Sequence, residues 1–208
     1  MDIILASTSP RRHQLLALAA IDFSTLSVDV DETILPNEKP QDYIVRMVET
    51  KAQQACQHYQ TKATNQDKDA DSSRLIITAD TIGVLADDHY ILVKPKDKAD
   101  AFAMWQQMSG TEHNIWTAVQ LTLVNQQGET VASEQLLEKT QVQFIELDEQ
   151  AMQAYWDTGE PQDKAGGYAI QGRGSVWVER INGSYSNVVG LPLAQTVAAI
   201  HKMQQHIV

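Results

Sequence analysis

The hydrophobic positions in the first half of the chain alternate between the period of strands and the period of helices. Residues 3–6 and 75–79 form short, continuous apolar runs, which are typical of strands buried on both faces of a sheet. Residues 23–30 alternate loosely, as a further strand would. Apolar residues recur at helical spacing over 10–20 and over 40–59. This order of strands and helices predicts an α/β protein.

The second half adds strand-like segments that are joined by short turns. The pattern predicts a hairpin turn at 87–89, a helix between 97 and 110, strands at 116–124 and 141–147, a helix at 149–157, a strand at 175–181 and a final helix from about 191. Ser9, Asp97 and Asp148 are the expected N-cap residues of the helices that follow them. Hairpins among alternating helices exclude a regular doubly wound fold. We therefore expect a mixed central sheet that is flanked by helices.

One stretch, residues 61–73, contains almost nothing that could enter a hydrophobic core. Its sequence, TKATNQDKDADSS, is polar or charged apart from two alanines. We interpret it as a polar surface loop and not as a linker between domains. The 208 residues are accordingly expected to form a single domain over 1–208.

The charge balance narrows the choice of partners. The chain carries 16 lysine and arginine residues against 27 aspartate and glutamate residues, which gives a formal net charge of −11. This sign disfavours binding to nucleic acid or to an anionic membrane, so an anionic substrate needs a local basic cluster. The single cysteine, Cys56, cannot form an internal disulfide, no apolar run is long enough to span a membrane, and the first residues lack the charged region of a signal peptide. We expect a cytoplasmic protein.

A first candidate site lies at residues 7–12, where an expected strand gives way to an expected helix. The sequence Ser-Thr-Ser-Pro-Arg-Arg places hydroxyl and guanidinium groups at a helix amino terminus, and these include Ser7, Arg11 and Arg12. Free backbone N–H groups and bidentate arginines bind phosphate well. An ordinary helix cap with two solvated arginines is the alternative interpretation.

Carboxylates supply a second group of candidates. Asp29, Asp31 and Glu32 lie within four residues, and carboxylates this close often hold Mg²⁺ or Mn²⁺. A solvated acidic loop is equally common in so acidic a chain. Asp80 follows the apolar run 75–79, where a charge is costly unless it binds a metal, pairs with a cation or works as a base. The alternative is that Asp80 caps a turn.

The most unusual stretch is residues 160–174, in which four glycines lie within nine residues. This density indicates a close approach of the backbone to a ligand, with Lys164 near a phosphate and Gln171 near a base edge. A flexible loop is the alternative. Lys51 and Lys94, each taken alone, match solvated lysines, and the six histidines show no spacing typical of a zinc site.

Six motifs occur together in one order along the chain. They are ASTSPRR (6–12), VDVDE (28–32), ADT (79–81), KP (94–95), DKAGGYAIQGRG (163–174) and INGSYSNVVGLP (181–192). With these motifs the sequence resembles the Maf-like nucleoside triphosphate pyrophosphatases over essentially its whole length. The resemblance implies hydrolysis of a nucleoside triphosphate between the α and β phosphates with a divalent metal, Mg²⁺ or Mn²⁺. It also implies an elongated, inosine triphosphatase-like fold with a mixed sheet and two lobes around a cleft, and a homodimer at the level of the family.

The resemblance assigns roles to individual residues as well. Arg11, Thr81 and Gln171 match the specificity residues of the branch that prefers dTTP and UTP over 7-methylguanosine triphosphate. The remaining matches are Asp80 as the proton acceptor, Glu32, Lys51 and Lys94 as further catalytic residues, and Ser7, Arg12, Asp163 and Lys164 as substrate-binding residues. Glu32 and Asp80 are the expected metal ligands. A base and a metal ligand cannot easily be one carboxylate, so the two roles of Asp80 compete.

Two other functions remain as alternatives at this point. One is the same reaction on a different nucleotide. The other is a regulatory nucleotide-binding protein linked to septum formation, for which catalysis is not required. Retention of Asp80, Glu32 and both Lys51 and Lys94 favours the enzyme, because a protein that only binds nucleotide could lose the base without penalty.

Overall fold

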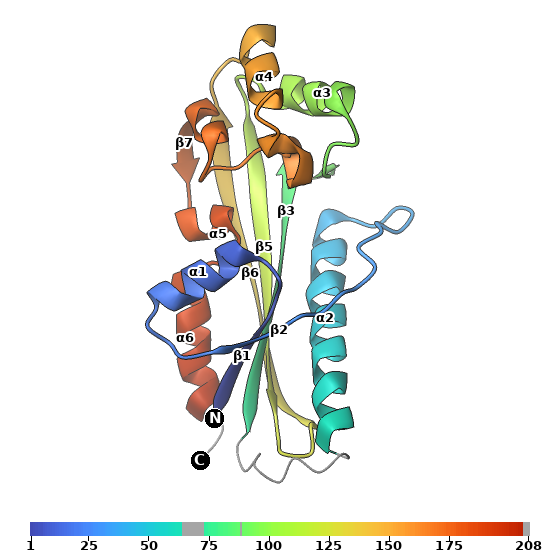
Figure 1. Cartoon of the computed structure of the whole chain (residues 1–208), viewed down its shortest axis with the longest axis vertical. Coiled ribbons are helices and arrows are strands. Elements are labelled where there is room, and N and C mark those ends of the chain that lie inside the picture. Colours follow the sequence, from blue (N-terminus) through green and yellow to red (C-terminus); the bar gives the residue numbers. More distant parts are fainter. Residues whose placement is uncertain (64–72, 88, 206–208) are drawn as a thin grey trace. The chain divides into compact units, whose positions relative to one another are not determined.

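The computed structural model describes residues 1–63, 73–87 and 89–205. Within these residues the strands form one seven-stranded sheet in the order β2-β1-β3-β5-β6-β7, with β4 paired to β3 (Figure 1). The chain divides into two compact units. Unit 1 comprises residues 1–80, 117–137 and 190–208, and unit 2 comprises residues 81–116 and 138–189.

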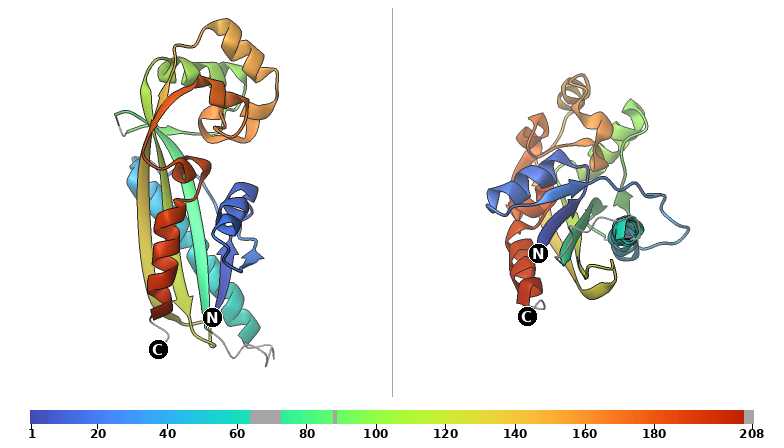
Figure 2. Two further views of the ribbon diagram at one scale, coloured as in Figure 1. Left: turned by 90° about the vertical axis from the view of Figure 1, so that its left-hand side faces the viewer. Right: turned by 60° about the horizontal axis from the view of Figure 1, so that its bottom comes forward.

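Among its described residues, unit 1 contains two parallel strand pairs. Its elements are β1 (Asp2–Ala6), α1 (Pro10–Leu18), β2 (Ser24–Leu26), α2 (Pro40–Ala63), the first part of β3 (Arg74–Leu85) and α6 (Leu193–Gln204), together with parts of β5 (Glu112–Val124) and β6 (Thr130–Phe144). Ile4 of β1 pairs in parallel with Ser24 of β2 and with Ile76 of β3. Within this unit α2 lies on one face of the sheet and α1 and α6 lie on the other (Figures 1 and 2).

The apolar pattern explains the packing of unit 1. Leu5 and Ile76 belong to the two continuous apolar runs, and both are fully buried because helices cover both faces of their strands. Ile44 and Val48 repeat at helical spacing along α2 and are also fully buried. The expected strands at 3–6 and 75–79, and the expected buried face of α2, are therefore confirmed.

Unit 2 has an aromatic core beneath short helices. Its own elements are β4 (Ile91–Leu92), α3 (Lys98–Met108), α4 (Glu149–Trp156), the 3-10 helices η1 (Glu160–Asp163), η2 (Ala165–Gly167) and η3 (Arg173–Trp177), β7 (Val178–Asn182) and α5 (Tyr185–Val189). Trp105, Tyr155 and Trp177 pack together, with ring centroids 4.6 to 5.6 Å apart. Such pairs stabilise a core beyond the area that they bury.

Side-chain caps and antiparallel strand pairs in unit 2 agree with the sequence, while residue 88 of the expected turn at 87–89 lies outside the described residues. The carboxylate of Asp97 accepts a hydrogen bond from Asp100 N at 2.9 Å, and Asp148 accepts one from Ala151 N at 2.7 Å. These caps satisfy first-turn amide groups of α3 and α4. β4 is antiparallel to β3 and β7 is antiparallel to β6, so the expected mixed sheet flanked by helices is confirmed.

The structure corrects several boundaries. The strand expected at 175–181 begins only at Val178, because residues 173–177 form η3. The strand expected at 23–30 is shortened to β2, and the chain beyond it becomes a long connection to α2. α2 continues to Ala63, so the first three residues of the expected surface loop 61–73 are helical, while residues 64–72 lie outside the described residues.

None of the helices in the described part of the chain combines the length and the hydrophobicity that a membrane span requires.

Candidate active site

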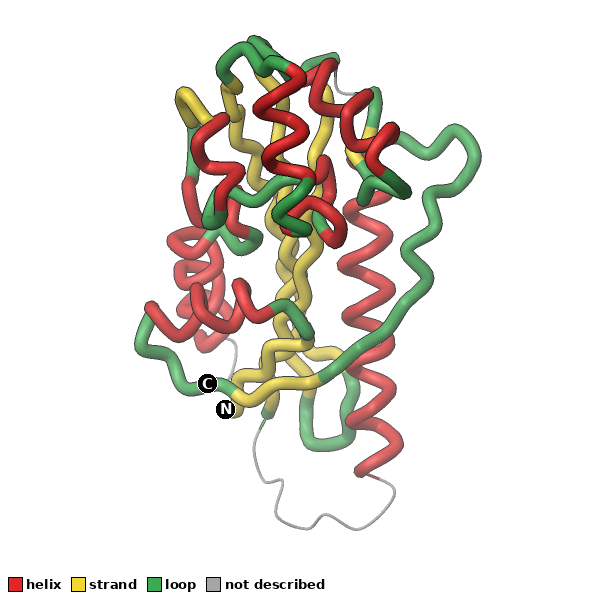
Figure 3. Tube along the Cα trace, turned by 45° about the horizontal axis from the view of Figure 1, so that its top comes forward, coloured by secondary structure: helices red, strands yellow, loops and turns green. Residues whose placement is uncertain are grey.

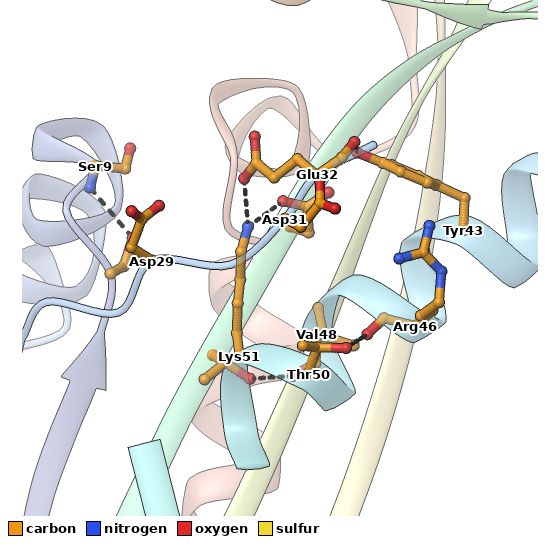
Figure 4. A network of polar contacts seen from close by, with 12 residues as sticks. Ser9, Asp29, Asp31, Glu32, Tyr43, Arg46, Val48, Thr50 and Lys51 are labelled. Carbon is orange, nitrogen blue, oxygen red and sulfur yellow. Dashed lines mark hydrogen bonds and ion pairs between the residues drawn. The ribbon is translucent and has the colours of Figure 1, made fainter. Parts of the chain in front are cut away.

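Lys51 lies between two carboxylates in unit 1. Its Nζ donates to Asp80 Oδ1 at 2.6 Å. It also donates to Glu32 Oε1 at 3.0 Å (Figure 4). Only 11% of the side chain of Lys51 and 11% of that of Asp80 are exposed, whereas 51% of the Glu32 side chain is exposed. Three residues with expected catalytic roles are therefore in direct contact.

The contact depends on how β3 packs against α2. Asp80 comes directly after the apolar run 75–79, which the sheet buries. Thr78 Oγ1 donates to Val48 O of α2 at 2.9 Å, which joins the strand to the helix one turn before Lys51. A buried ion pair of this kind costs desolvation and adds little net stability, so the pair is better explained by function than by folding.

The amino terminus of α1 brings a second cation to this unit. Arg12 Nε donates to Gly190 O at 2.9 Å, and Arg12 Nη1 contacts Ser7 Oγ at 3.5 Å. His13 Nε2 lies 2.6 Å from Ser7 O. These contacts orient the Arg12 guanidinium and the turn that carries Ser7.

Arg12 shares its electrostatic surroundings with the carboxylates. Burial lowers the pKa of the Arg12 guanidinium. The negative charges of Asp80 and Glu32 raise this pKa, and the positive charge of Arg11 lowers it. The pKa remains below its usual value because burial has the largest effect. Arg12, Lys51, Asp80 and Glu32 thus belong to one charged cluster. Arg11 lies in the first turn of the same helix, with its side chain exposed.

Ser9 occupies the N-cap position of α1, as its sequence predicts, and Pro10 is the first helical residue. Within the described residues, the Ser9 side chain makes no capping hydrogen bond. The first-turn amide groups of α1 are consequently not capped by Ser9, and they remain suited to an anionic ligand beside Arg12.

The other expected site residues belong to unit 2. Thr81 follows Asp80 in β3 and is half-buried. Lys94 and Gln171 are exposed. Gly166 N donates to Val93 O at 3.0 Å, which holds the glycine-rich stretch beside the residue that precedes Lys94. Of the remaining two, Asp163 ends η1, and Lys164 Nζ donates to Glu160 O at 2.9 Å.

Glu160 organises the glycine-rich stretch from inside. Its Oε1 accepts from Tyr155 OH at 2.7 Å and from Gly174 N at 3.4 Å, and its Oε2 accepts from Arg173 N at 3.0 Å. Burial raises the pKa of Glu160, but these hydrogen bonds and the charge of Lys164 outweigh burial and leave the pKa below its usual value. The carboxylate is therefore held in its charged form.

The glycines in this stretch have a structural reason. A Cβ atom at Gly172 would lie 2.2 Å from Glu160 Oε1, and one at Gly174 would lie 2.8 Å from Tyr155 OH. The glycine density was interpreted as a close approach of the backbone to a ligand. At Gly172 and Gly174 the groups that approach the backbone closely are instead the side chains of Glu160 and Tyr155. Glu160 is the first residue of the stretch 160–174, but neither Glu160 nor Tyr155 was predicted to have this role.

Tyr43 and Arg46 on α2 are two further residues at the site that the sequence did not predict. Tyr43 OH donates to Glu32 O at 3.0 Å, and Arg46 Nη2 donates to Thr33 O at 3.0 Å. Tyr43 lies eight positions, about two turns, before Lys51, which is a weak spacing signal. Arg46 lies five positions before Lys51, a spacing that does not share a helix face, so the sequence offered no such signal for Arg46.

Two carboxylates of unit 1, Glu32 and Asp80, are the candidate ligands of the expected divalent metal. Within the described residues there is no group of three or more His, Cys, Asp and Glu side chains that could hold a metal ion. Glu32 and Asp80 nevertheless converge on the same ammonium group. Mg²⁺ is commonly held by one or two carboxylates and takes its other oxygens from water and substrate phosphates, so this pair fits such an ion.

Known proteins are similar to this chain over nearly its whole length. The family described as Maf-like protein matches residues 2–203. The chain is 49% identical to a dTTP/UTP pyrophosphatase of Psychrobacter cryohalolentis, with 98% of this chain and 97% of the relative covered. It is 44% identical to a dTTP/UTP pyrophosphatase of Pseudoalteromonas atlantica (97% and 96% covered) and 40% identical to one of Geobacillus sp. WCH70 (97% and 97% covered). Since the family match spans nearly the whole chain, the chain belongs to the Maf-like protein family.

Proposed function

We propose that this protein hydrolyses dTTP and UTP, and modified pyrimidine nucleotides of the same shape, to a nucleoside monophosphate and pyrophosphate. The relatives named dTTP/UTP pyrophosphatase, at 40 to 49% identity over almost the full chain, support the substrate class. The observation that carries the reaction is the contact of Lys51 with both Asp80 and Glu32, beside Arg12.

Asp80 is the proposed proton acceptor. A water molecule attacks the α-phosphorus, a new P–O bond forms, and the bond from that phosphorus to the bridging oxygen of pyrophosphate breaks. The carboxylate of Asp80 takes the proton that the water loses, and Lys51 Nζ, 2.6 Å away, holds that carboxylate in place. Pyrophosphate leaves with the electron pair of the broken bond.

The cationic residues of the site offset the repulsion between the negatively charged protein and its triphosphate substrate. A triphosphate carries about four negative charges, and a protein of net charge −11 repels it at long range. Arg12 and Lys51 of unit 1 bind phosphate oxygens in this proposal, and Lys94 and Lys164 of unit 2 have the same role. Ser7 and Asp163 complete the substrate-binding set. Guanidinium groups suit this task because they bind phosphate with two parallel hydrogen bonds.

A divalent cation, when bound, neutralises charge on the phosphates and acts as a Lewis acid. Glu32 and Asp80 are the residues that would hold it. Glu32 is the more accessible of the two, because half of its side chain is exposed while that of Asp80 is largely buried. We therefore assign the metal chiefly to Glu32 and proton transfer to Asp80.

Recognition of the base is assigned to Arg11, Thr81 and Gln171. The chain works in this proposal as one catalytic domain over 1–208, in the cytoplasm, where its nucleotide substrates are found. The unpaired Cys56 agrees with a reducing compartment. A homodimer is the proposed assembly, and neither nucleic acid nor a membrane is a proposed partner.

The test is a substrate panel with isotope labelling. The purified protein is incubated in ¹⁸O-water with dTTP, UTP, CTP, 7-methylguanosine triphosphate and purine triphosphates, with and without Mg²⁺ or Mn²⁺. We expect metal-dependent hydrolysis chiefly of dTTP and UTP, with ¹⁸O in the monophosphate, because the α-phosphorus is attacked. Label in pyrophosphate would contradict that step. Preference for another nucleotide would overturn the roles of Arg11, Thr81 and Gln171.

Asp80→Asn is the matching variant, with Asp22→Asn as the control because Asp22 is exposed on the same unit. We expect Asp80→Asn to lose nearly all turnover while Asp22→Asn keeps it. Turnover close to that of the wild type in Asp80→Asn would remove Asp80 from the reaction. Nucleotide binding by the wild-type protein without any hydrolysis would instead favour the regulatory role.

A further inference from the structure

Glu32 sits on a long connection that has no regular secondary structure. Residues 27–39 lead from the end of β2 to the start of α2, as Figure 3 shows in green. Half of the Glu32 side chain is exposed, and its ion pair with Lys51 is the kind of partly solvated contact that contributes little by itself. The position of the Glu32 carboxylate must therefore be set by its backbone.

That backbone is fastened to α2 at two successive carbonyl groups. Tyr43 OH donates to Glu32 O at 3.0 Å, and Arg46 Nη2 donates to Thr33 O at 3.0 Å. Figure 4 shows Tyr43, Arg46 and Lys51 rising from the same helix toward Glu32. One helix thus holds the main chain of Glu32 and also supplies the ammonium group that meets its side chain.

Arg46 also fastens the far end of the connection. Its Nε donates to Glu38 Oε1 at 2.5 Å and its Nη2 donates to Glu38 Oε2 at 2.6 Å, a bidentate pair. Glu38 Oε2 accepts in addition from Leu35 N at 2.9 Å. The guanidinium therefore closes the segment 33–38 into a loop, with Thr33 at one end and Glu38 at the other. A lysine has a single nitrogen and cannot reproduce this fork.

The charge states of the pair agree with a strong contact. The hydrogen bond to Glu38 raises the pKa of Arg46, and the hydrogen bond from Arg46 lowers the pKa of Glu38. Asp31 Oδ1 accepts from Thr33 N at 2.9 Å, which tightens the turn next to Glu32. The segment around Glu32 is consequently ordered by polar contacts and not by burial.

We propose that Arg46, supported by Glu38 and Tyr43, is a positioning residue that places the Glu32 carboxylate at Lys51 and thereby sets the rate of hydrolysis. This inference rests on the proposed function, because it takes Glu32 to be a catalytic residue. Residues that only orient a functional side chain typically change activity by about 10- to 100-fold when they are replaced.

The first experiment compares Arg46→Lys with Arg180→Lys. Arg180 is the matched control, since it too pairs with a glutamate, Glu112, but on an exposed surface of unit 2. We expect kcat for dTTP to fall about 10-fold in Arg46→Lys, with KM changed less than kcat and with the thermal midpoint close to that of Arg180→Lys. Faster hydrogen exchange of the Leu35 and Glu38 amides should accompany the loss. A merely structural role would lower the thermal midpoint and leave kcat of the folded protein unchanged.

The second experiment is a double-mutant cycle with Glu32→Gln. If Arg46 acts through Glu32, then Arg46→Lys lowers kcat in the wild-type background and has no further effect in the Glu32→Gln background. Additive losses would overturn the inference while leaving Glu32 catalytic. A Glu32→Gln variant with wild-type kcat would instead contradict the proposed role of Glu32, so the two failures are distinguishable. Where steady-state turnover of Glu32→Gln is too slow to measure, the same cycle is read from single-turnover rates with the protein in excess over dTTP.

Tyr43→Phe is the second variant, for the case in which Arg46→Lys does not fold. It removes a single hydroxyl group and one hydrogen bond, to Glu32 O. We expect the same direction of change, with a smaller loss of kcat that also disappears in the Glu32→Gln background. An unchanged kcat in Tyr43→Phe, together with additive losses in the Arg46 cycle, would show that α2 does not position Glu32 and would overturn the inference.

Discussion

Lys51 Nζ lies 2.6 Å from Asp80 Oδ1, although the two residues are 29 positions apart in the sequence. Each side chain is only 11% exposed. Two largely buried opposite charges are stable together, but either one becomes costly when its partner is removed. Stability and activity are thus linked at this pair, and the link can be measured.

Lys51→Met should lower both stability and turnover. Without the ammonium group the Asp80 carboxylate is left largely buried with its nearest cation gone, which costs about 3 kcal/mol of unfolding free energy. Urea denaturation measures this loss. Adding Asp80→Asn to Lys51→Met should restore part of the stability, since the uncompensated charge is removed, while hydrolysis stays absent. Losses of stability that simply add would contradict the coupling.

Lys202→Met is the control, because 62% of the Lys202 side chain is exposed in its pair with Glu134 and its loss costs below about 1 kcal/mol.

Arg12→Lys should weaken binding of the triphosphate. The charge remains, but the contact of Arg12 Nε with Gly190 O, which orients the guanidinium, is lost. A charge-assisted hydrogen bond contributes enough that KM for dTTP should rise on the order of 10-fold. Steady-state kinetics measures the change, and Arg180→Lys is again the matched control. An unchanged KM would mean that Arg12 does not bind the phosphates.

Stability should depend on the protonation of His113. Burial lowers the pKa of His113 to about 4, and its Nε2 lies 2.7 Å from Tyr168 OH. An unfolded histidine has a pKa of about 6.5, so between these two values the unfolded state binds more protons. The stabilisation is therefore complete above about pH 6.5 and is lost as the pH falls toward 4, by up to about 3 kcal/mol.

Urea denaturation from pH 4.5 to 7.5 tests this for His113→Gln, which cannot take up the proton. The pH dependence of its unfolding free energy should be smaller than that of the wild type by up to about 1.4 kcal/mol per pH unit. His201→Gln, which replaces an exposed histidine, should keep the wild-type slope. Equal slopes for the wild type and His113→Gln would show that another group causes the acid sensitivity.

Gly172→Ala should disturb the segment that carries Gln171. The new Cβ would lie 2.2 Å from Glu160 Oε1, so the carboxylate has to move away from Tyr155 and Arg173. Overpacking of this kind costs about 2 kcal/mol. Because Gln171 is the adjacent residue, the ratio of dTTP to CTP turnover should change as well. Denaturation and competition kinetics measure the two effects.

Gly159→Ala separates a clash from backbone strain. Gly159 has a φ of +72°, but among the described residues no heavy atom beyond Gly159 and its two chain neighbours lies within 4 Å of the position that a Cβ would take. Alanine there meets only the cost of the left-handed conformation, about 1 kcal/mol, and should leave the substrate ratio unchanged. Equal effects of Gly159→Ala and Gly172→Ala on the substrate ratio would argue against the role of Glu160.

Much of the fold could be predicted because its signals are local. Asp97 and Asp148 cap α3 and α4 as expected, since an N-cap bond spans only three residues. The buried face of α2 was visible in the spacing of Ile44 and Val48. The strand expected at 175–181 was wrong at its start, because Glu160 binds the main chain of Arg173 and Gly174 and draws it into η3.

The sequence by itself determined the order of strands and helices, the helix caps and the motifs that place the chain in its family. These features depend on neighbours in the chain or on residue identity alone. Only the tertiary structure decided that Lys51 meets both Asp80 and Glu32, that Arg46 holds Thr33 and Glu38, and that Glu160 occupies the space a side chain at Gly172 would need. These contacts form when α2 packs against β3 and when α4 and η1 pack beside the glycine-rich stretch. The local spacing of residues determines which side chains share a face of one helix or strand, but not which side chains of separate segments meet.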